Sequence, residues 1–277
     1  MPNDTKKIFH RCGTCSRTFH FLLNREFGHP ADAEERAADP LAGGLMRTGH
    51  QCGMLWGASL AVGAEASRRY RDPDQAAAVA IATTRGLMES FAGSAKSVDC
   101  REITGCDLTS KSGLAKLLLK TVLGLFYYSP CFNLAEKWTP EAFRTAKEGL
   151  TLVPTESPQP PLSCASLLAK KMGAGDAEAA MVAGFAGGLG LSGNACGALG
   201  AAIWLRALAA CRNDTGKPSA DRNQGEVQQI LRDFDQATAG EILCAKISGR
   251  RFATIDEHGE FIRNGGCGTL IDLLAHS

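Results

Sequence analysis

Cysteine is the residue type in this chain whose number and spacing could do chemistry. Eight of the eleven cysteines form two sets of four in the same order: Cys15, Cys52, Cys100 and Cys131, followed by Cys164, Cys196, Cys244 and Cys267. The two middle members of the sets keep one offset of 144 residues, whereas the outer pairs are offset by 149 and 136. Packing does not require a thiol, because any small apolar residue would fill the same space. The shared register therefore indicates that four thiols act together in each half.

Four thiolates are the ligand set of a [2Fe-2S] or [4Fe-4S] cluster, so each set predicts one iron–sulfur site. The intervals of 37, 48 and 31 residues in the first set place the ligands on separate elements, unlike the close pairs of a zinc finger. Three alternatives stay open. Two neighbouring thiols suffice for a thiol–disulfide oxidoreductase, with Cys52 or Cys196 as the nucleophile. The cysteines could also form a metal-binding or interaction module without turnover, or pack reduced in a core.

A glycine-rich loop precedes the second cysteine of each set. Glycine lets a backbone approach a bound group closely and adopt positive φ. The candidate cofactor-binding residues are therefore the glycines Gly44, Gly49, Gly53, Gly188, Gly193 and Gly197. A cysteine that opens a helix is expected to have a lowered pKa, because the helix dipole favours the thiolate. This expectation applies to Cys52 and Cys196.

One histidine stands in the loop of the first half. His50 precedes Cys52 by two residues, where it could donate a proton or a hydrogen bond to a cluster. It is therefore the third catalytic candidate, although a solvated loop histidine would have no such role. Its counterpart is Asn194, and Arg47 is likewise opposite Leu191. If a single half is catalytic, these residues mark the first.

The elements that hold the cysteines are predicted to be helices in two homologous units. Residues 32–34 (Asp-Ala-Glu) recur at 176–178, and residues 42–45 (Ala-Gly-Gly-Leu) recur at 186–189, again with an offset of 144. Such internal repeats determine the domain organisation. We expect an all-α protein of two helical-bundle repeats related by pseudo-symmetry, 1–150 and 151–277. The proline-rich segment 152–161 is predicted to be the linker.

Helix boundaries are predicted from capping residues. Asp72 followed by Pro73 is typical of an N-cap and first helical residue. Asp32 and Asp176 are candidate N-caps, and Thr139, followed by proline, is predicted to start another helix. Apolar spacing predicts further helices over 113–123 and 225–234.

The cysteines and the residues after Cys52 and Cys196 resemble the C_GCAxxG_C_C family of redox proteins. The family's central motif runs Cys-Gly-Ala-x-x-Gly; the first half departs from it at Met54 and the second at Ala201. The resemblance covers both halves. It implies a redox role through an iron–sulfur cluster, held by the residues that match the family's four cysteines: Cys15, Cys52, Cys100, Cys131, Cys164, Cys196, Cys244 and Cys267.

Composition and charge argue against several other classes of function. The formal net charge is +1 and aromatic residues make up 6%, so neither a basic nucleic-acid surface nor a base-stacking platform is expected. Residues 181–205 are weakly apolar, but a glycine-rich loop divides them and predicts two buried helices rather than a membrane span. Residues 1–10 lack the apolar core of a signal peptide. We expect a cytoplasmic protein that exchanges electrons with a partner protein or a small acceptor, and that could form a homo-oligomer.

Three cysteines and one glycine motif fall outside the duplicated pattern. Cys12 forms a CxxC with Cys15 but lacks a counterpart, so it is either a resolving or ligand thiol of the first half or incidental. Cys106 and Cys211 are expected to be core residues. Residues 188–193 spell the dinucleotide fingerprint, but no strand is predicted before them, and the fingerprint requires one.

Overall fold

The computed structural model describes residues 4–110, 112, 113, 115, 116, 119, 129–152, 160, 162–213 and 224–277. The first half contains α1 (Thr5–Cys12), α2 (Cys15–Phe27), α3 (Asp32–Ala37), η2 (Asp39–Leu41), α4 (Gly53–Arg69), α5 (Pro73–Ser94), α6 (Cys100–Thr104) and α8 (Pro130–Gly149). The second half contains α9 (Cys164–Lys171), α10 (Asp176–Met181), η3 (Ala183–Phe185), α11 (Gly197–Asn213), α12 (Gln224–Thr238), α13 (Cys244–Ile247), α14 (Ile255–Arg263) and α15 (Gly268–His276). The described residues form no strand, which confirms the all-α prediction.

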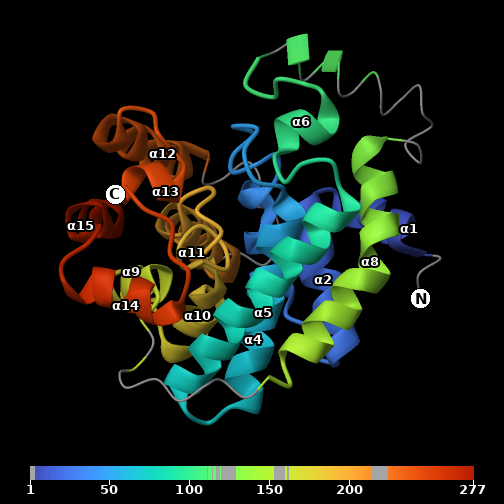
Figure 1. The fold of residues 1–277 in the computed structure, drawn as a ribbon. Coiled ribbons are helices and arrows are strands. Elements are labelled where there is room, and N and C mark those ends of the chain that lie inside the picture. Colours follow the sequence, from blue (N-terminus) through green and yellow to red (C-terminus); the bar gives the residue numbers. More distant parts are fainter. Residues whose placement is uncertain are drawn as a thin grey trace.

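The helices of the second repeat lie beside those of the first (Figure 1). Buried residues of both repeats belong to one large hydrophobic cluster. Helix α3 of the first repeat packs against α11 of the second, and α10 of the second packs against α4 of the first. Because α10 and α11 are the counterparts of α3 and α4, these contacts are reciprocal. The predicted pseudo-symmetry is therefore an exchange of equivalent contacts across one interface.

Trp56 of the first repeat contacts Gly200, the equivalent residue of the second repeat. The Trp56 ring faces Gly200, and a Cβ on Gly200 would lie 2.3 Å from Trp56 Cζ3. Residue 200 is the 144-residue counterpart of residue 56, so this position contacts its own counterpart. The Phe185 ring packs edge-on to Trp56 with centroids 4.7 Å apart. The Trp56 ring therefore occupies the space that a side chain at residue 200 would need.

The helix starts agree with the sequence in part. Asp72 accepts a hydrogen bond from the Asp74 amide and caps α5, as predicted. The predictions for Asp32 and Asp176 were wrong by one residue, because both are the first residue of their helices. In α3 the Glu35 carboxylate provides the capping bond instead, accepting from the Ala31 amide at 3.1 Å.

The prediction of a helix start at Thr139 was also wrong, because α8 begins nine residues earlier, with Ser129 as its N-cap. Pro140 lies inside this helix. The Thr139 hydroxyl donates to the Ala135 carbonyl at 2.7 Å, and Trp138 is buried with its ring edge-on to Phe91. Tertiary packing therefore holds the helix together across a residue that lacks an amide hydrogen.

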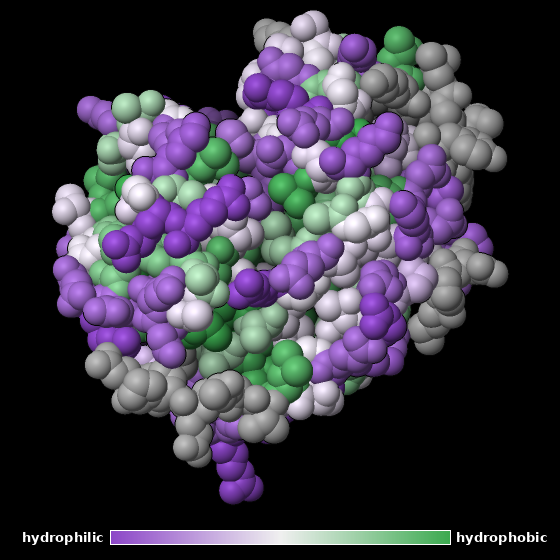
Figure 2. Space-filling model, in the orientation of Figure 1, coloured by the Kyte–Doolittle hydropathy of each residue, from purple (hydrophilic) through white to green (hydrophobic). Residues whose placement is uncertain are grey.

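Two further predictions concern long segments. Helix α12 confirms the predicted helix over 225–234. The predicted helix over 113–123 and the linker over 152–161 lie for the most part outside the described residues. In the described part of the chain, no helix combines the length and apolarity needed to cross a membrane. Figure 2 shows hydrophobic side chains in separate patches among hydrophilic ones on one face.

Candidate functional site

All eight cysteines of the two sets lie at helix N-termini. Four are the first residues of α2, α6, α9 and α13; Cys52 and Cys267 are the N-caps of α4 and α15; Cys131 is the second residue of α8; and Cys196 directly precedes α11. Helix N-termini carry partial positive charge and unbonded amide hydrogens. Each set of thiols therefore faces groups that favour anionic sulfur.

The second set surrounds one cavity. Cys164, Cys196, Cys244 and Cys267 all line a space of about 20 Å³, together with apolar side chains such as Phe252 and Ile262. This volume holds about one water-sized group. Cys164 and Cys196 are buried, whereas Cys244 and Cys267 are partly exposed. The structure thus brings together four cysteines that the sequence separates by up to 103 residues.

The first set is arranged around an interacting pair, Cys15 and Cys52. The Cys52 thiol donates to the Cys15 sulfur, and the backbone amides of Gly43 and Ser16 also point at that sulfur, so the pKa of Cys15 is lowered. The pKa of Cys52 is correspondingly raised by its bond to Cys15 and by burial. The pair therefore favours a thiolate on Cys15.

The other thiols of the first set lie within electrostatic range of this pair. Burial, and then negative charge on Cys15, raise the pKa of Cys131 to about 12 and also raise the pKa of Cys100. Cys131 is partly exposed, while Cys15, Cys52 and Cys100 are buried. The first set is thus a cluster of four thiols with one side toward the surface.

Burial outweighs the helix dipole at most of these sulfurs. It raises the pKa of Cys164 to about 12 and that of Cys196 to about 11, although amides of Gly187 and Leu199 oppose the shift. The expected lowering at Cys52 and Cys196 was therefore wrong. A thiolate in a buried site pays a desolvation cost that helix termini reduce without cancelling. Sequence could not supply this result, because depth of burial is set by tertiary packing.

The glycine loops form an unusual backbone turn next to the first cysteine of each set. Positive φ angles of 50–77° run through residues 43–47, and angles of 56–82° run through residues 187–191. Leu45, Met46 and Arg47 adopt this left-handed conformation without being glycine, at a typical cost of about 1–2 kcal/mol each. The first residue of each turn, Gly43 or Gly187, directs its amide at Cys15 or Cys164.

Several of the predicted cofactor-binding glycines are required for close packing of the loop backbone. A Cβ on Gly44 would lie 2.3 Å from the His50 carbonyl oxygen, and one on Gly188 would lie 2.6 Å from that of Asn194. A Cβ on Gly53 would lie 2.6 Å from the Cys15 sulfur, so this position directly adjoins a site thiol. Gly197 faces the Phe185 carbonyl oxygen and lines the cavity of the second set.

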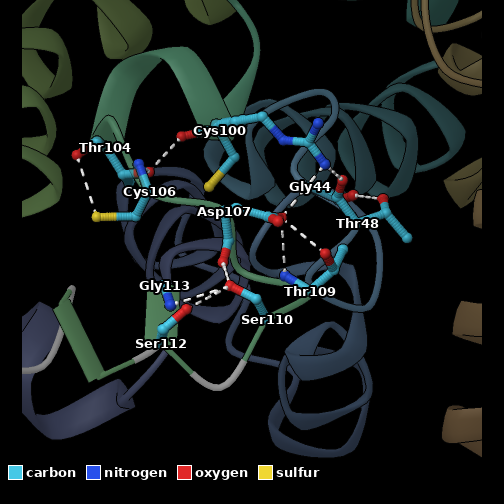
Figure 3. Close-up of polar contacts among 11 residues, drawn as sticks. Gly44, Thr48, Cys100, Thr104, Cys106, Asp107, Thr109, Ser110, Ser112 and Gly113 are labelled. Carbon is cyan, nitrogen blue, oxygen red and sulfur yellow. Dashed lines mark hydrogen bonds and ion pairs between the residues drawn. The ribbon is translucent and has the colours of Figure 1, made fainter.

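An arginine covers the loop in each repeat, although it comes from a different sequence position. Arg101 donates to the Thr48 carbonyl at 3.3 Å and packs on Gly49, while Arg251 donates to the Ser192 carbonyl at 3.5 Å and packs on Gly193. Arg101 also pairs with Asp107. Figure 3 shows Asp107 beside Gly44 and Thr48 of the first loop. The two loops are held alike, but Asp107 partly neutralises the arginine of the first.

His50 lies at the junction of the repeats. Its backbone carbonyl accepts from the Cys100 amide at 2.7 Å, as Asn194 does from Cys244 at 2.6 Å. Burial lowers the pKa of its side chain, and its charged neighbours include Asp99 in the first repeat and Glu241 in the second. The backbone role is shared by both repeats, whereas the imidazole belongs to the first alone.

A second histidine, His258, was missed by sequence reasoning. It is buried, lines the cavity of the four cysteines, and its pKa is lowered to about 4 by burial. Its Nδ1 lies 3.0 Å from the Leu162 carbonyl oxygen. No motif marks this residue, because its site partners lie 9 to 94 residues away in the chain. The sequence offered one sign of this difference: His258 lies between Cys244 and Cys267, whereas the equivalent segment between Cys100 and Cys131 contains no histidine.

The three cysteines outside the sets occupy different surroundings. Cys106 and Cys211 are buried, as expected of core residues. Cys106 also lies near Cys100 and Cys131, whose pKa values it helps to raise, and it donates to the Thr104 carbonyl (Figure 3). Cys12 ends α1 and interacts with Thr18 rather than with the site thiols.

Two kinds of site find no support in the structure. The fingerprint over 188–193 follows η3 and forms the left-handed turn, so it lacks the strand that dinucleotide binding requires. Within the described residues, no three His, Cys, Asp or Glu side chains are arranged to hold a single metal ion.

Comparison with known proteins agrees with the duplicated site. The family model described as "Putative redox-active protein (C_GCAxxG_C_C)" matches twice, over residues 13–126 and 163–276. No curated protein and no solved structure matches the chain. The second match contains all four cysteines of the second set, whereas the first contains Cys15, Cys52 and Cys100 and ends before Cys131. The chain therefore belongs to the C_GCAxxG_C_C family of redox-active proteins and carries the family unit twice.

Proposed function

We propose that the protein transfers electrons through one iron–sulfur cluster in each repeat. The observation that carries this proposal is the convergence of four thiols on one cavity in the second repeat, all at helix N-termini. Four thiolates are the ligand set of [2Fe-2S] and [4Fe-4S] clusters. When bound, the cluster would accept an electron from a donor and pass it to an acceptor, with no net change in the thiolates.

The surroundings of the sulfurs fit such a group. The cysteines of a cluster are distributed over two or four iron atoms, so they do not need to surround one point as ligands of a single ion do. Gly53 has no Cβ, which would lie 2.6 Å from the Cys15 sulfur, and amides of Gly43 and Gly187 point at Cys15 and Cys164. Amide hydrogen bonds to sulfur stabilise thiolates and raise a cluster's reduction potential. The cavity of about 20 Å³ would have to widen by rotation of the cysteine side chains.

Partial exposure supports exchange with a partner. Cys131 in the first repeat, and Cys244 and Cys267 in the second, reach toward the surface, while the other ligands are buried. A donor or acceptor, either a protein or a small molecule, could therefore approach each site on that side. Reduced thiols in this number are typical of the cytoplasm, where we place the protein.

The test is to purify the protein without oxygen and to measure its visible spectrum and its iron, acid-labile sulfide and zinc per chain. We expect a brown protein with iron and sulfide in comparable amounts. Cys52→Ser should remove about half of both, because it disables one of two sites, whereas Cys211→Ser should remove none. A colourless protein without iron and sulfide would refute the proposal.

A second candidate function is thiol–disulfide exchange by Cys15 and Cys52. The lowered pKa of Cys15, next to the Cys52 thiol, is the pattern of an activated pair. Oxidation would join the two sulfurs and transfer two electrons and two protons to a disulfide substrate. This candidate uses Cys15 as the nucleophile rather than Cys52. Metal-free protein whose Cys15 and Cys52 are recovered as a disulfide after oxidation would favour it over the cluster.

A further inference from the structure

The first site adjoins a fifth thiol that neither candidate function uses. Cys106 is 3% exposed and forms a small buried cluster with Cys100 and Leu108. The residue 144 positions later is Arg250, which is exposed, so the second repeat has no equivalent thiol. Four cysteines already supply the ligands of a cluster. A buried thiol beside a complete ligand set needs an explanation, because any small apolar residue would pack as well.

The backbone after α6 turns sharply and holds Cys106 close to the start of that helix. Helix α6 has five residues and ends at Gly105, whose φ of 62° is left-handed. The Thr104 hydroxyl donates to the Cys100 carbonyl at 2.8 Å and accepts from the Cys106 amide at 3.3 Å. One threonine thus joins the backbones of the two cysteines (Figure 3). The position of Cys106 is therefore fixed by the same turn that positions Cys100.

Cys106 also lies close to Cys131, which comes from a different helix. Burial is the largest cause of the raised pKa of Cys131, and charges on Cys15 and Cys106 add to it. At Cys100 burial is again the largest cause, and Cys106 again adds to the raised pKa. Such effects weaken with distance, so Cys106 is near both ligands. Its thiol donates to the Thr104 carbonyl at 3.5 Å, and because S–H is a weak donor, rotation away from this carbonyl costs little.

Cys131 is the ligand that Cys106 is best placed to replace. It is the partly exposed member of the first set, whereas Cys100 and Cys106 are buried. Exposure makes a cysteine more open to oxidation, so Cys131 is the ligand of this set most at risk. The family match over the first repeat ends at residue 126, so it contains Cys106 but not Cys131. Loss of Cys131 would leave three buried ligands and one open coordination position near Cys106.

We propose that Cys106 is a reserve ligand of the first site, which takes the coordination position of Cys131 when that thiol is lost. The inference rests on the proposed function, since it assigns a ligand to the first cluster. The exchange needs no electron, because Cys106 releases its proton to solvent as its sulfur binds iron, and four thiolates hold the cluster before and after. The second site has no such reserve, because Arg250 stands at the equivalent position. The two sites therefore differ in how they tolerate loss of their fourth cysteine.

The experiment compares alanine variants of the full-length protein, purified without oxygen, by their iron and acid-labile sulfide per chain. Alanine is chosen because its side chain cannot bind iron. Cys131→Ala should keep the full amounts, whereas the equivalent variant of the second repeat, Cys267→Ala, should lose about half. Cys106→Ala should also keep the full amounts, because Cys131 is then present. The double variant Cys131→Ala with Cys106→Ala should lose about half, because neither thiol remains.

The variants separate this inference from the proposed function. Wild type without iron and sulfide would refute the proposed function itself. Wild type with full iron but loss of about half in Cys131→Ala, or in Cys106→Ala alone, would refute the reserve role and leave the clusters in place. Full iron in the double variant would likewise exclude Cys106 as the replacement. Cys131→Ala with Cys211→Ala is the matched control, because Cys211 is buried outside both sets; it should keep full iron, and a loss there would also overturn the assignment.

Discussion

Substitution of Gly53 by alanine tests the geometry of the first site. Gly53 is the first residue of α4, and its φ lies outside the left-handed region. Alanine would therefore cause no backbone strain there, and its cost would come from steric overlap of the new Cβ with its neighbours. The new Cβ would lie 2.6 Å from the Cys15 sulfur and 3.0 Å from Ala42 Cα. Ordinary contacts between heavy atoms lie near 3.5–4 Å, so the overlap with sulfur is about 1 Å.

This overlap is expected to cost about 1–3 kcal/mol, the usual range for added volume in a packed interior. In a chain of this length, the melting temperature of the metal-free protein should fall by roughly 2–4 °C per kcal/mol. Because Cys15 must move, anaerobically purified Gly53→Ala should also lose about half of its iron and sulfide. Both quantities are measured on the same preparation, by calorimetry and by metal analysis.

Gly93→Ala is the matched control. Gly93 lies within α5, and a Cβ there would meet nothing within 4 Å. Alanine should therefore raise stability by about 0.5–1 kcal/mol, through its better helix propensity, and leave iron unchanged. Gly53→Ala protein with wild-type melting temperature and full iron would refute the placement of the Cys15 sulfur against Gly53.

Further outcomes follow from the same packing. Gly200→Ala should lose about 1–3 kcal/mol in denaturant unfolding, because its Cβ would lie 2.3 Å from the Trp56 ring, and Trp56→Leu should reduce that loss in a double-mutant cycle. Burial lowers the pKa of His20 to about 3, so the unfolded chain binds the proton first as pH falls. The contribution of His20 alone should remove roughly 1.6 kcal/mol of stability from pH 6.5 to 5, so His20→Leu should lose that much less than the wild type when unfolding is measured at the two pH values. The raised pKa values of Cys164 and Cys196 act in the opposite direction: metal-free protein should lose stability as pH rises above 9, because thiols ionise first in the unfolded chain. Cys164→Ala and Cys196→Ala should each weaken this pH dependence, and an unchanged profile in both variants would contradict the prediction.

Helix boundaries illustrate how local signals compete with packing. Asp72 and Pro73 predicted their helix start correctly, because a cap and a proline act within a few residues. Pro140 carries the same kind of signal and is overruled, since burial of Trp138 and the bond from Thr139 sustain α8 through it. Likewise, glycines indicated a turn, but the left-handed conformation of Leu45 could be seen only in the structure.

The sequence by itself determined the duplication, the all-α class and the identity of the eight thiols, because register and helical periodicity are properties of the chain order. Tertiary structure alone decided that these thiols meet at helix N-termini, that burial raises the pKa of Cys196, and that His258 joins the second site. The physical reason is distance along the chain: His258 and Cys164 are 94 residues apart, and only the packing of α9 and α14 around one cavity makes them neighbours.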